Sequence, residues 1–218
     1  HADTPVVIAG YGRFGQIVGR MLRANGIEVT ILDLDPNMVD ILGRLGVKVY
    51  YGDATRIELL QAAGSAKAKL FVVAVDDMQQ AVTIVKEVRR HFPKLHILAR
   101  ARNPQSYYEL TKAGANAVIR ETFGSAWETG TMALRAMGFR AFTAQRLAQR
   151  WRRHEERELG ELAKLWDDDD EAPYWAAARR SLVEAERLMR DEDPQVYSDR
   201  DGAWDNESLR EHVAARGR

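Results

Sequence analysis

A glycine-rich turn near the start of the chain constrains the fold more than any other stretch. An apolar run at residues 6–9 leads directly into Gly10-Tyr11-Gly12-Arg13-Phe14-Gly15, and a helical pattern of apolar residues follows. A strand, a G-x-G-x-x-G turn and a helix in this order form the dinucleotide-binding fingerprint. The first glycine permits the tight turn, the second lets a pyrophosphate approach bare backbone, and the third lets the helix pack closely on the strand. We therefore predict a nucleotide site at the start of this helix, where backbone amides face an anion.

A carboxylate ends the second predicted strand, residues 27–33. Asp33 lies about 20 residues beyond the fingerprint, the interval expected for the acid that holds the ribose hydroxyls. The same carboxylate would repel a 2′-phosphate, and neither Leu34 nor Asp35 supplies a positive charge to offset the repulsion. The sequence therefore predicts that AMP or NAD(H) is preferred over NADP(H) as the ligand.

Strand and helix patterns alternate through about residue 120. The predicted strands cover residues 6–9, 27–33, 47–51, 70–75, 95–99 and 117–119, and helical patterns separate them. The run at 70–75 is apolar throughout, as expected of a parallel strand covered on both faces. This alternation predicts an α/β fold: a Rossmann-type, doubly wound, parallel six-stranded sheet with right-handed crossovers, followed by a helical C-terminal extension.

Two further strand ends contribute candidate site residues. Asp53 follows the third strand, where it either accepts a hydrogen bond from the adenine amino group or satisfies the backbone of its own turn. Thr55 is well placed to cap the next helix. The complete set of predicted cofactor-binding residues is Gly10, Tyr11, Gly12, Arg13, Phe14, Gly15, Asp33, Leu34, Asp53, Ala54, Thr55 and Val75.

Composition excludes several classes of protein. The 218 residues contain 32 basic and 32 acidic side chains, so no net charge recruits nucleic acid. Cysteine is absent, which excludes disulfides and thiolate chemistry, and the five histidines fall at no metal-ligand spacing. We predict no metal site and no nucleic-acid partner.

The character of the chain changes after residue 120. Three helical patterns, at 121–137, about 143–166 and 174–190, precede a polar stretch. We predict a nucleotide-binding domain at 1–120, a helical dimerisation and regulatory segment at 121–190, and a loosely ordered tail at 191–218. The first of these helices carries Trp127, Met132 and Met137 outside a completed Rossmann unit, which favours a dimer interface over packing on its own sheet.

The second half lacks the features of a catalytic domain. A dehydrogenase needs a region that presents a substrate and an acid or base to the nicotinamide. Charged helix dominates the residues after 120, and no His-Asp, Lys-Tyr or Ser-Lys arrangement appears at a plausible site. This absence favours a sensor over an enzyme; a small NAD-dependent oxidoreductase is the alternative.

Five short segments taken together resemble a known family. They read Gly-Tyr-Gly-Arg-Phe-Gly at 10–15, Leu-Asp-Leu-Asp-Pro at 32–36, Val-Tyr-Tyr-Gly-Asp-Ala-Thr-Arg at 49–56, Ala-Arg-Ala-Arg at 99–102 and Arg-Glu-Thr-Phe at 120–123. Over about residues 5–155 the chain resembles the cytosolic regulatory domain, of the KTN/RCK or TrkA-N-like class, of Kef-type glutathione-regulated potassium efflux antiporters.

The resemblance implies a ligand-sensing domain that gates potassium/proton antiport. It implies a homodimer with AMP or NAD(H) in the Rossmann cleft, and glutathione or its adducts near the dimer interface. It also implies a membrane antiporter domain upstream of residue 1, a location on the cytoplasmic face of the inner membrane and, in some members, a flavin quinone-reductase-like ancillary subunit. The start of the chain at His1, without a methionine, is expected of an excised piece of such a protein.

Arginines are the candidate ligands for glutathione, whose two carboxylates suit bidentate guanidinium groups. The resemblance and this chemistry select Arg13, Arg102, Arg120 and Arg152, each equally open to ordinary surface salt bridging. Residues 107–112 depart from the family, because closer members carry arginines where this chain reads Tyr-Tyr-Glu-Leu-Thr-Lys. The identity of the thiol ligand stays open, and a nucleotide-binding subunit of a potassium uptake system or channel, without glutathione control, is a second alternative.

Overall fold

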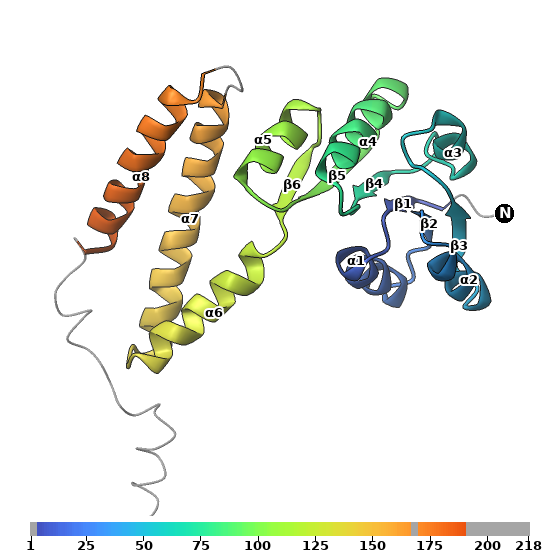
Figure 1. Ribbon diagram of the computed structural model, residues 1–218. Helices are drawn as coiled ribbons and strands as arrows, with labels where there is room; N and C mark the ends of the chain where they lie inside the picture. The colour runs from blue at the N-terminus through green and yellow to red at the C-terminus, as the bar shows by residue number, and fades with distance from the viewer. Residues whose placement is uncertain (1–3, 167–169, 191–218) are drawn as a thin grey trace, which may run out of the picture. The chain divides into compact units, whose positions relative to one another are not determined.

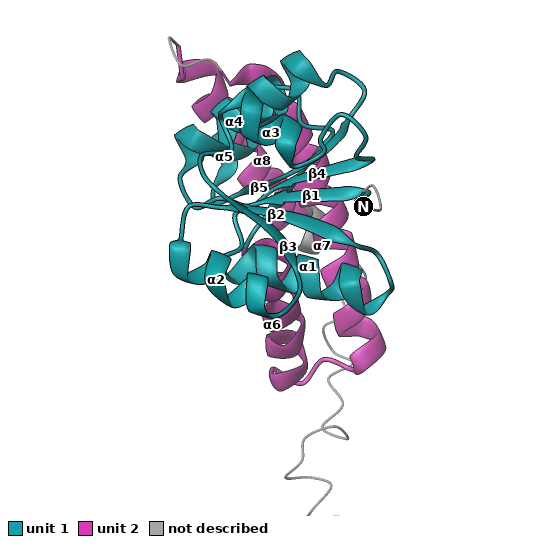
Figure 2. Cartoon of the chain, turned by 90° about the vertical axis from the view of Figure 1, so that its right-hand side faces the viewer, with its two compact units in different colours: residues 1–121 teal, residues 122–218 magenta. Residues whose placement is uncertain are grey.

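The chain divides into two compact units, residues 1–121 and residues 122–218 (Figure 2). The computed structural model describes residues 4–166 and 170–190. The tail predicted at 191–218 lies outside the described residues.

The first unit is built on a six-stranded parallel sheet with strand order β3-β2-β1-β4-β5-β6 (Figure 1). The prediction of a Rossmann-type sheet is confirmed, because the order reverses between β1 and β4, the point where two doubly wound halves meet. The strands are β1 (Val6–Ala9), β2 (Val29–Asp33), β3 (Lys48–Tyr51), β4 (Leu70–Val73), β5 (His96–Ala101) and β6 (Ala117–Arg120).

Helices cover both faces of the sheet, and a hydrophobic cluster lies between the sheet and the helices on each face. Val6 and Ile8 of β1 point into a cluster with α1 and α2, whereas Val7 and Ala9 point into a larger cluster with α3, α4 and α5. Alternate residues of one strand therefore serve opposite layers, and all four residues of β1 are buried. The helices are α1 (Arg13–Ala24), α2 (Pro36–Arg44), α3 (Ile57–Ala62), α4 (Met78–His91) and α5 (Pro104–Lys112).

Two strands, β2 and β4, are two residues shorter than their apolar runs predict. β2 begins at Val29 rather than Ile27, because the Ile27 amide donates to Leu22 O and closes the end of α1. β4 ends at Val73 rather than Val75, since the chain there passes against the backbone of Gly10. A contact with a neighbouring turn therefore delays the start of β2 and brings forward the end of β4.

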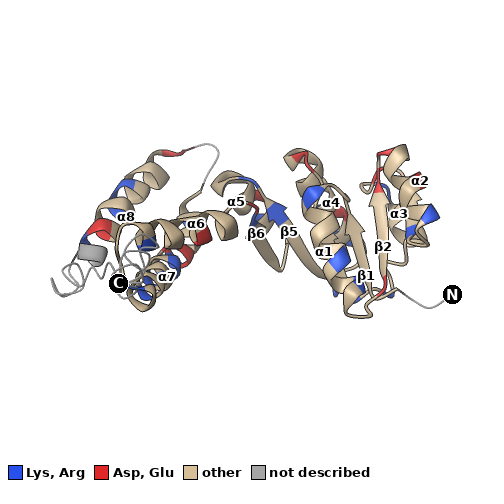
Figure 3. Ribbon diagram, turned by 90° about the horizontal axis from the view of Figure 1, so that it is seen from below, with Lys and Arg blue, Asp and Glu red and all other residues tan. Residues whose placement is uncertain are grey.

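The described part of the second unit consists of three helices: α6 (Phe123–Ala136), α7 (Ala141–Leu165) and α8 (Ala172–Arg190). The indole N–H of Trp127 donates to Ala148 O at 2.8 Å, and the rings of Phe123 and Trp151 stack with centroids 5.8 Å apart. These contacts hold α6 against α7, yet α6 contains no buried residue. Lysine, arginine and acidic residues occur together on the helices of both units (Figure 3). Among the described residues, no helix combines the length and apolar character that crossing a bilayer requires.

Candidate nucleotide-binding cleft

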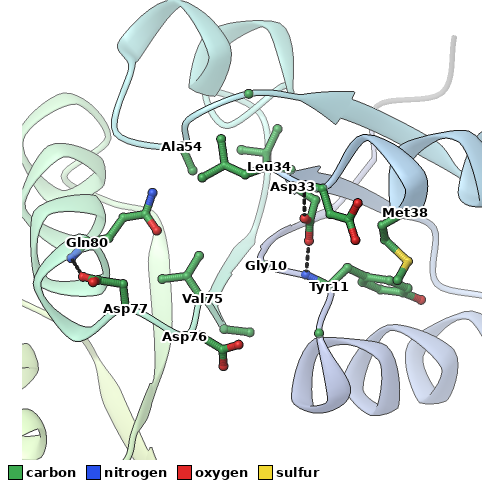
Figure 4. Close-up of a pocket in the computed structure, with 15 residues that line it drawn as sticks. Gly10, Tyr11, Asp33, Leu34, Met38, Ala54, Val75, Asp76, Asp77 and Gln80 are labelled. Atoms are coloured by element: carbon green, nitrogen blue, oxygen red, sulfur yellow. Dashed lines mark hydrogen bonds between the residues drawn. The ribbon is translucent and has the colours of Figure 1, made fainter.

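A cleft of about 530 Å³ opens at the carboxyl ends of β1, β2 and β4 (Figure 4). This is the crevice in which open α/β sheets bind ligands, next to the reversal in strand order. Its walls come from the glycine turn, the ends of β2 and β3, and the segment that joins β4 to α4. The lining residues are Gly10, Tyr11, Gly12, Leu32, Asp33, Leu34, Asp35, Met38, Gly52, Ala54, Ala74, Val75, Asp76, Asp77 and Gln80.

The three glycines of the turn meet three different surroundings. Gly10 has a φ of +89°, and a Cβ there would lie 2.7 Å from Val75 N. A Cβ on Gly15 would lie 2.1 Å from Gly10 O, so this position permits the close helix–strand contact. Gly12 has an ordinary φ of −67°, and a Cβ added to it would meet no atom within 4 Å. Packing therefore requires the first and third glycines, whereas the second leaves open space at the start of α1.

The amino terminus of α1 has no side-chain cap. Gly12 occupies the N-cap position without a side-chain hydrogen bond, and the first turn carries no acidic residue. By contrast, Asp35, Asp77 and Asn103 cap α2, α4 and α5 by accepting an amide at 2.9, 2.7 and 2.8 Å. Uncapped amides at a helix start, with the positive end of the dipole behind them, suit a phosphate.

Asp33 ties two segments of the cleft together. One carboxylate oxygen accepts the Tyr11 amide at 2.6 Å, and the other accepts the Asp35 amide at 2.8 Å. The Tyr11 side chain is buried in the cluster under α1, where its ring lies against Gly19. Tyr11 therefore lines the cleft next to Asp33 while its ring anchors the turn to the core.

The third strand end differs in detail from its prediction. Asp53 Oδ1 accepts the Thr55 amide at 2.9 Å and the side-chain amide of Gln80 at 3.4 Å, so Asp53 satisfies the backbone of its own turn. The Thr55 amide holds the pKa of the Asp53 carboxyl below its ordinary value of 3.8. The prediction that Thr55 caps the next helix is wrong: α3 begins at Ile57, with Arg56 as an N-cap residue that makes no side-chain cap.

Seven of the twelve predicted cofactor-binding residues line the cleft: Gly10, Tyr11, Gly12, Asp33, Leu34, Ala54 and Val75. The other five are Arg13, Phe14, Gly15, Asp53 and Thr55, and they lie next to it. Arg13 is exposed on the first turn of α1, while Phe14 packs into the cluster under that helix. At the start of α1, the side chains of Arg13 and Phe14 therefore do not line the cleft, although both residues follow Gly12 directly.

Several lining residues of the cleft were not predicted from sequence patterns. Met38 comes from α2, Gln80 from α4, and Asp76 and Asp77 from the segment after β4. The two acids stand directly after an apolar strand, which is the signal that could have identified them, since every strand end near the reversal point borders the crevice. Nothing in local spacing marks Met38 or Gln80.

Asp76 is the most strongly paired acid of the cleft. Its Oδ1 accepts Arg100 at 2.6 Å and Arg102 at 3.0 Å. The hydrogen bond from Arg100 is the main reason why the pKa of the Asp76 carboxyl lies below its ordinary value. Within residues 4–166 and 170–190, histidines and acids form no group of three that could hold a metal ion.

The four arginines predicted for glutathione are spread over both units. Arg13 and Arg102 are exposed after β1 and β5, and Arg120 is half-buried as the last residue of β6, paired in register with Ala101. Arg152 lies on α7 in the second unit, where it donates to Glu156 at 2.8 Å and lies over the Trp127 ring at 5.5 Å. Arg13, Arg102 and Arg120 thus lie at the carboxyl ends of strands in the sheet.

Comparison with protein-family models gives a match for each unit. The model of the TrkA-N domain matches residues 6–121, more than half of the chain. The chain belongs to the TrkA-N domain family. The model of the potassium efflux system KefB C-terminal domain matches residues 125–203. The resemblance to Kef-type regulatory domains is thereby confirmed along both parts of this TrkA-N chain.

Individual relatives agree with the family models. The glutathione-regulated potassium-efflux system protein KefC of Enterobacter sp. (strain 638) is 38% identical over 208 residues, which are 95% of this chain and 33% of that protein. The chain therefore spans about a third of the length of this relative.

Two solved structures extend the comparison. The Shewanella denitrificans Kef CTD in AMP bound form is 42% identical, with a TM-score of 0.69 over 74% of this chain and 99% of that one. The TrkA-N domain of the Escherichia coli inner membrane protein ybaL is 28% identical, with a TM-score of 0.56 over 58% of this chain and 93% of that one.

Proposed function

We propose that the cleft binds AMP or NAD(H) as a structural or signalling ligand. The uncapped start of α1 carries the argument, because it presents free amides beside the open space at Gly12 and the carboxylate of Asp33. In the proposed complex, the phosphate binds at the start of α1 and the ribose hydroxyls donate hydrogen bonds to Asp33. The AMP-bound state of the Shewanella Kef CTD supports the proposal.

Titration calorimetry tests the nucleotide. AMP and NADH should each give saturable binding to the 218-residue chain, with one site per chain. Absence of heat and of any thermal stabilisation with both nucleotides would contradict the proposal.

The chain then acts as the ligand-sensing regulatory part of a potassium efflux system coupled to proton entry. The names of the KefC relatives support this role, and the two-thirds of their length beyond the match would supply a membrane antiporter domain upstream of residue 1. The domain would lie on the cytoplasmic face of the inner membrane. A ligand with different affinities for two arrangements of the domain would bias transport between them. Potassium efflux from cells that carry the full-length protein, with and without a cleft substitution, tests this role.

The same proposal makes the chain a regulator and not an enzyme. The described part of the second unit supplies helices, and its cavity of about 370 Å³ between α6 and α7 has an almost entirely apolar lining that includes Phe123, Leu134 and Trp151. The lining of this cavity contains no side chain that could act as a catalytic acid or base. Turnover of NADH with a panel of carbonyl substrates would favour the oxidoreductase alternative instead.

The second unit is proposed to form a homodimer through α6. This helix has no buried residue, and Met132 and Met137 are 64% and 66% exposed. Glutathione or its adducts would bind near that interface through Arg13, Arg102, Arg120 or Arg152, and a flavin quinone-reductase-like subunit could associate with the assembly. Calorimetry with glutathione on dimeric protein separates this efflux role from that of an uptake or channel subunit without glutathione control.

A further inference from the structure

One buried cation lies beside the cleft without lining it. Arg100 is near the end of β5, and its side chain is only 2% exposed. A buried guanidinium is costly unless it is paired, so the position requires a specific partner. The partners of Arg100 are the carboxylates of Asp76 and Glu121.

The two carboxylates hold Arg100 unequally. A terminal nitrogen of Arg100 donates to Asp76 Oδ1 at 2.6 Å and to Val75 O at 3.2 Å. Nε of Arg100 lies 3.8 Å from Glu121 Oε2 and makes no hydrogen bond. Arg102 reaches the same oxygen of Asp76 from the surface, at 3.0 Å. Asp76 therefore receives two guanidinium groups, and Glu121 is the weaker neighbour.

Asp76 lines the cleft on the segment that follows β4, next to the glycine turn where the phosphate is proposed to bind. Its side chain is 75% exposed, and Asp76 lines the cleft next to Val75 (Figure 4). Val75, the preceding residue, lies against Gly10. On the buried side, the Arg100 guanidinium lies 5.8 Å from the ring centroid of Phe14, the second residue of α1. The pair thus joins the segment after β4 to the neighbouring strand β5, close to the first turn of this helix.

The cleft is lined by several acidic side chains, which affects how it can bind a phosphate. Asp33, Asp35, Asp76 and Asp77 all line the cleft, which has no lysine or arginine in its lining. Asp35 and Asp77 are occupied as helix caps, and Asp33 holds the glycine turn. Asp76 makes neither contact, and it follows Val75, which lies against Gly10 of the glycine turn. An unpaired charge on Asp76 would therefore oppose a phosphate bound at the start of α1.

We propose that Arg100 is a positioning residue that makes this acidic cleft accept a phosphate, because it neutralises Asp76 beside the start of α1. The inference rests on the proposed nucleotide binding. It adds that the positive charge of Arg100 permits a phosphate to bind in the cleft. The ligand class it selects is a nucleotide that carries a 5′-phosphate, as AMP does, in contrast to the uncharged nucleoside.

The test compares AMP with adenosine, which share the base and ribose and differ in the phosphate. A phosphate dianion close to an unpaired carboxylate, even in a water-like dielectric, should bind about tenfold more weakly. Since Arg102 stays in place, Arg100→Met should weaken AMP binding by about three- to tenfold and leave adenosine binding unchanged. Arg100→Met/Asp76→Asn should restore the AMP affinity. Glu121→Gln, which removes the other carboxylate next to Arg100, is the matched control and should bind AMP like the parent chain.

Several results would overturn the inference. Equal losses for AMP and adenosine would show a structural role for Arg100, and an unchanged AMP affinity in Arg100→Met would show that Asp76 does not oppose the phosphate. If Arg100→Met does not fold, Asp76→Asn alone decides: AMP should bind more tightly than to the parent chain and adenosine equally, and no gain for AMP sinks the proposal. If the parent chain does not bind AMP at all, the proposed function fails and this inference fails with it. If the parent chain binds AMP but Arg100→Met binds it equally well, only this inference fails.

Discussion

The carboxylate of Asp33 accepts the Tyr11 amide at 2.6 Å, which joins the end of β2 to the glycine turn that follows β1. Its second oxygen accepts the Asp35 amide at 2.8 Å. A carboxylate has about four lone-pair sites, so Asp33 can hold both amides and still accept ribose hydroxyls. The residue is therefore a brace of the cleft walls as well as the proposed acceptor for the ligand.

Asp33→Ala should weaken AMP binding by about 10- to 100-fold, because hydrogen bonds to a charged group contribute about 1.5–3 kcal/mol. Calorimetry measures the affinity, and circular dichroism should still show a cooperative unfolding transition. Asp33→Asn keeps one carbonyl acceptor and should lie between the parent chain and the alanine variant. An unchanged AMP affinity in Asp33→Ala would refute the ribose assignment.

Two alanine substitutions in the glycine turn should separate folding from binding. Gly15→Ala places a methyl group 2.1 Å from Gly10 O and should lower the melting temperature markedly. Gly12→Ala adds a methyl group in open space and should leave the melting temperature almost unchanged, yet it should weaken AMP binding because the methyl group occupies the approach of the phosphate. A stable Gly12→Ala variant with full AMP affinity would place the phosphate elsewhere.

NADPH should bind at least about tenfold more weakly than NADH, since its 2′-phosphate would meet the charges of Asp33 and Asp35. Competition of both cofactors against AMP provides the measurement. Asp33→Asn is the informative variant, because it should narrow the gap between the two cofactors. Equal or tighter binding of NADPH to the parent chain would contradict the predicted selectivity.

The paired acids predict a loss of stability at low pH. The Thr55 amide depresses the pKa of Asp53, and Arg100 depresses that of Asp76, relative to an ordinary value of 3.8. Each ionised group stabilises the folded state above that ordinary value, and the contribution is lost as the pH falls through the depressed pKa. Urea midpoints recorded from pH 6 downward to about 3 should therefore fall less steeply in Asp53→Asn/Asp76→Asn than in the parent chain. Parallel curves for the two proteins would show that these pairs add no pH-dependent stability.

Met132→Glu should shift the proposed dimer toward monomer, because it places a charge on the exposed apolar face of α6. Sedimentation velocity over a range of concentrations reports the shift. Gln79→Glu adds the same side chain at an exposed position of α4 and should leave the association state as it is. If both variants sediment like the parent chain, α6 is not the interface.

Sequence reasoning recovered the sheet because each strand of a doubly wound domain is marked by its own apolar run. The glycine turn and Asp33 were accessible for the same reason: their roles depend on backbone geometry at fixed distances along the chain. Asp76 and Gln80 were missed as cleft residues because their place depends on the pairing of β4 beside β1, a contact between segments far apart in sequence. Arg100 was noted only as part of the Ala-Arg-Ala-Arg segment. Its burial depends on Asp76, which comes from another part of the chain, so the local sequence does not reveal it.

The two hydrophobic clusters occupy opposite faces of the sheet, and the cleft lies across the strand ends that both clusters support. A molecule bound there contacts segments from each layer, so its binding energy is added to the cohesion of the whole unit. By mass action, a ligand at about 100 times its dissociation constant adds about 2.7 kcal/mol to the free energy of unfolding. Occupancy of the cleft would thus set how long the domain survives in the cell, as well as which arrangement it favours.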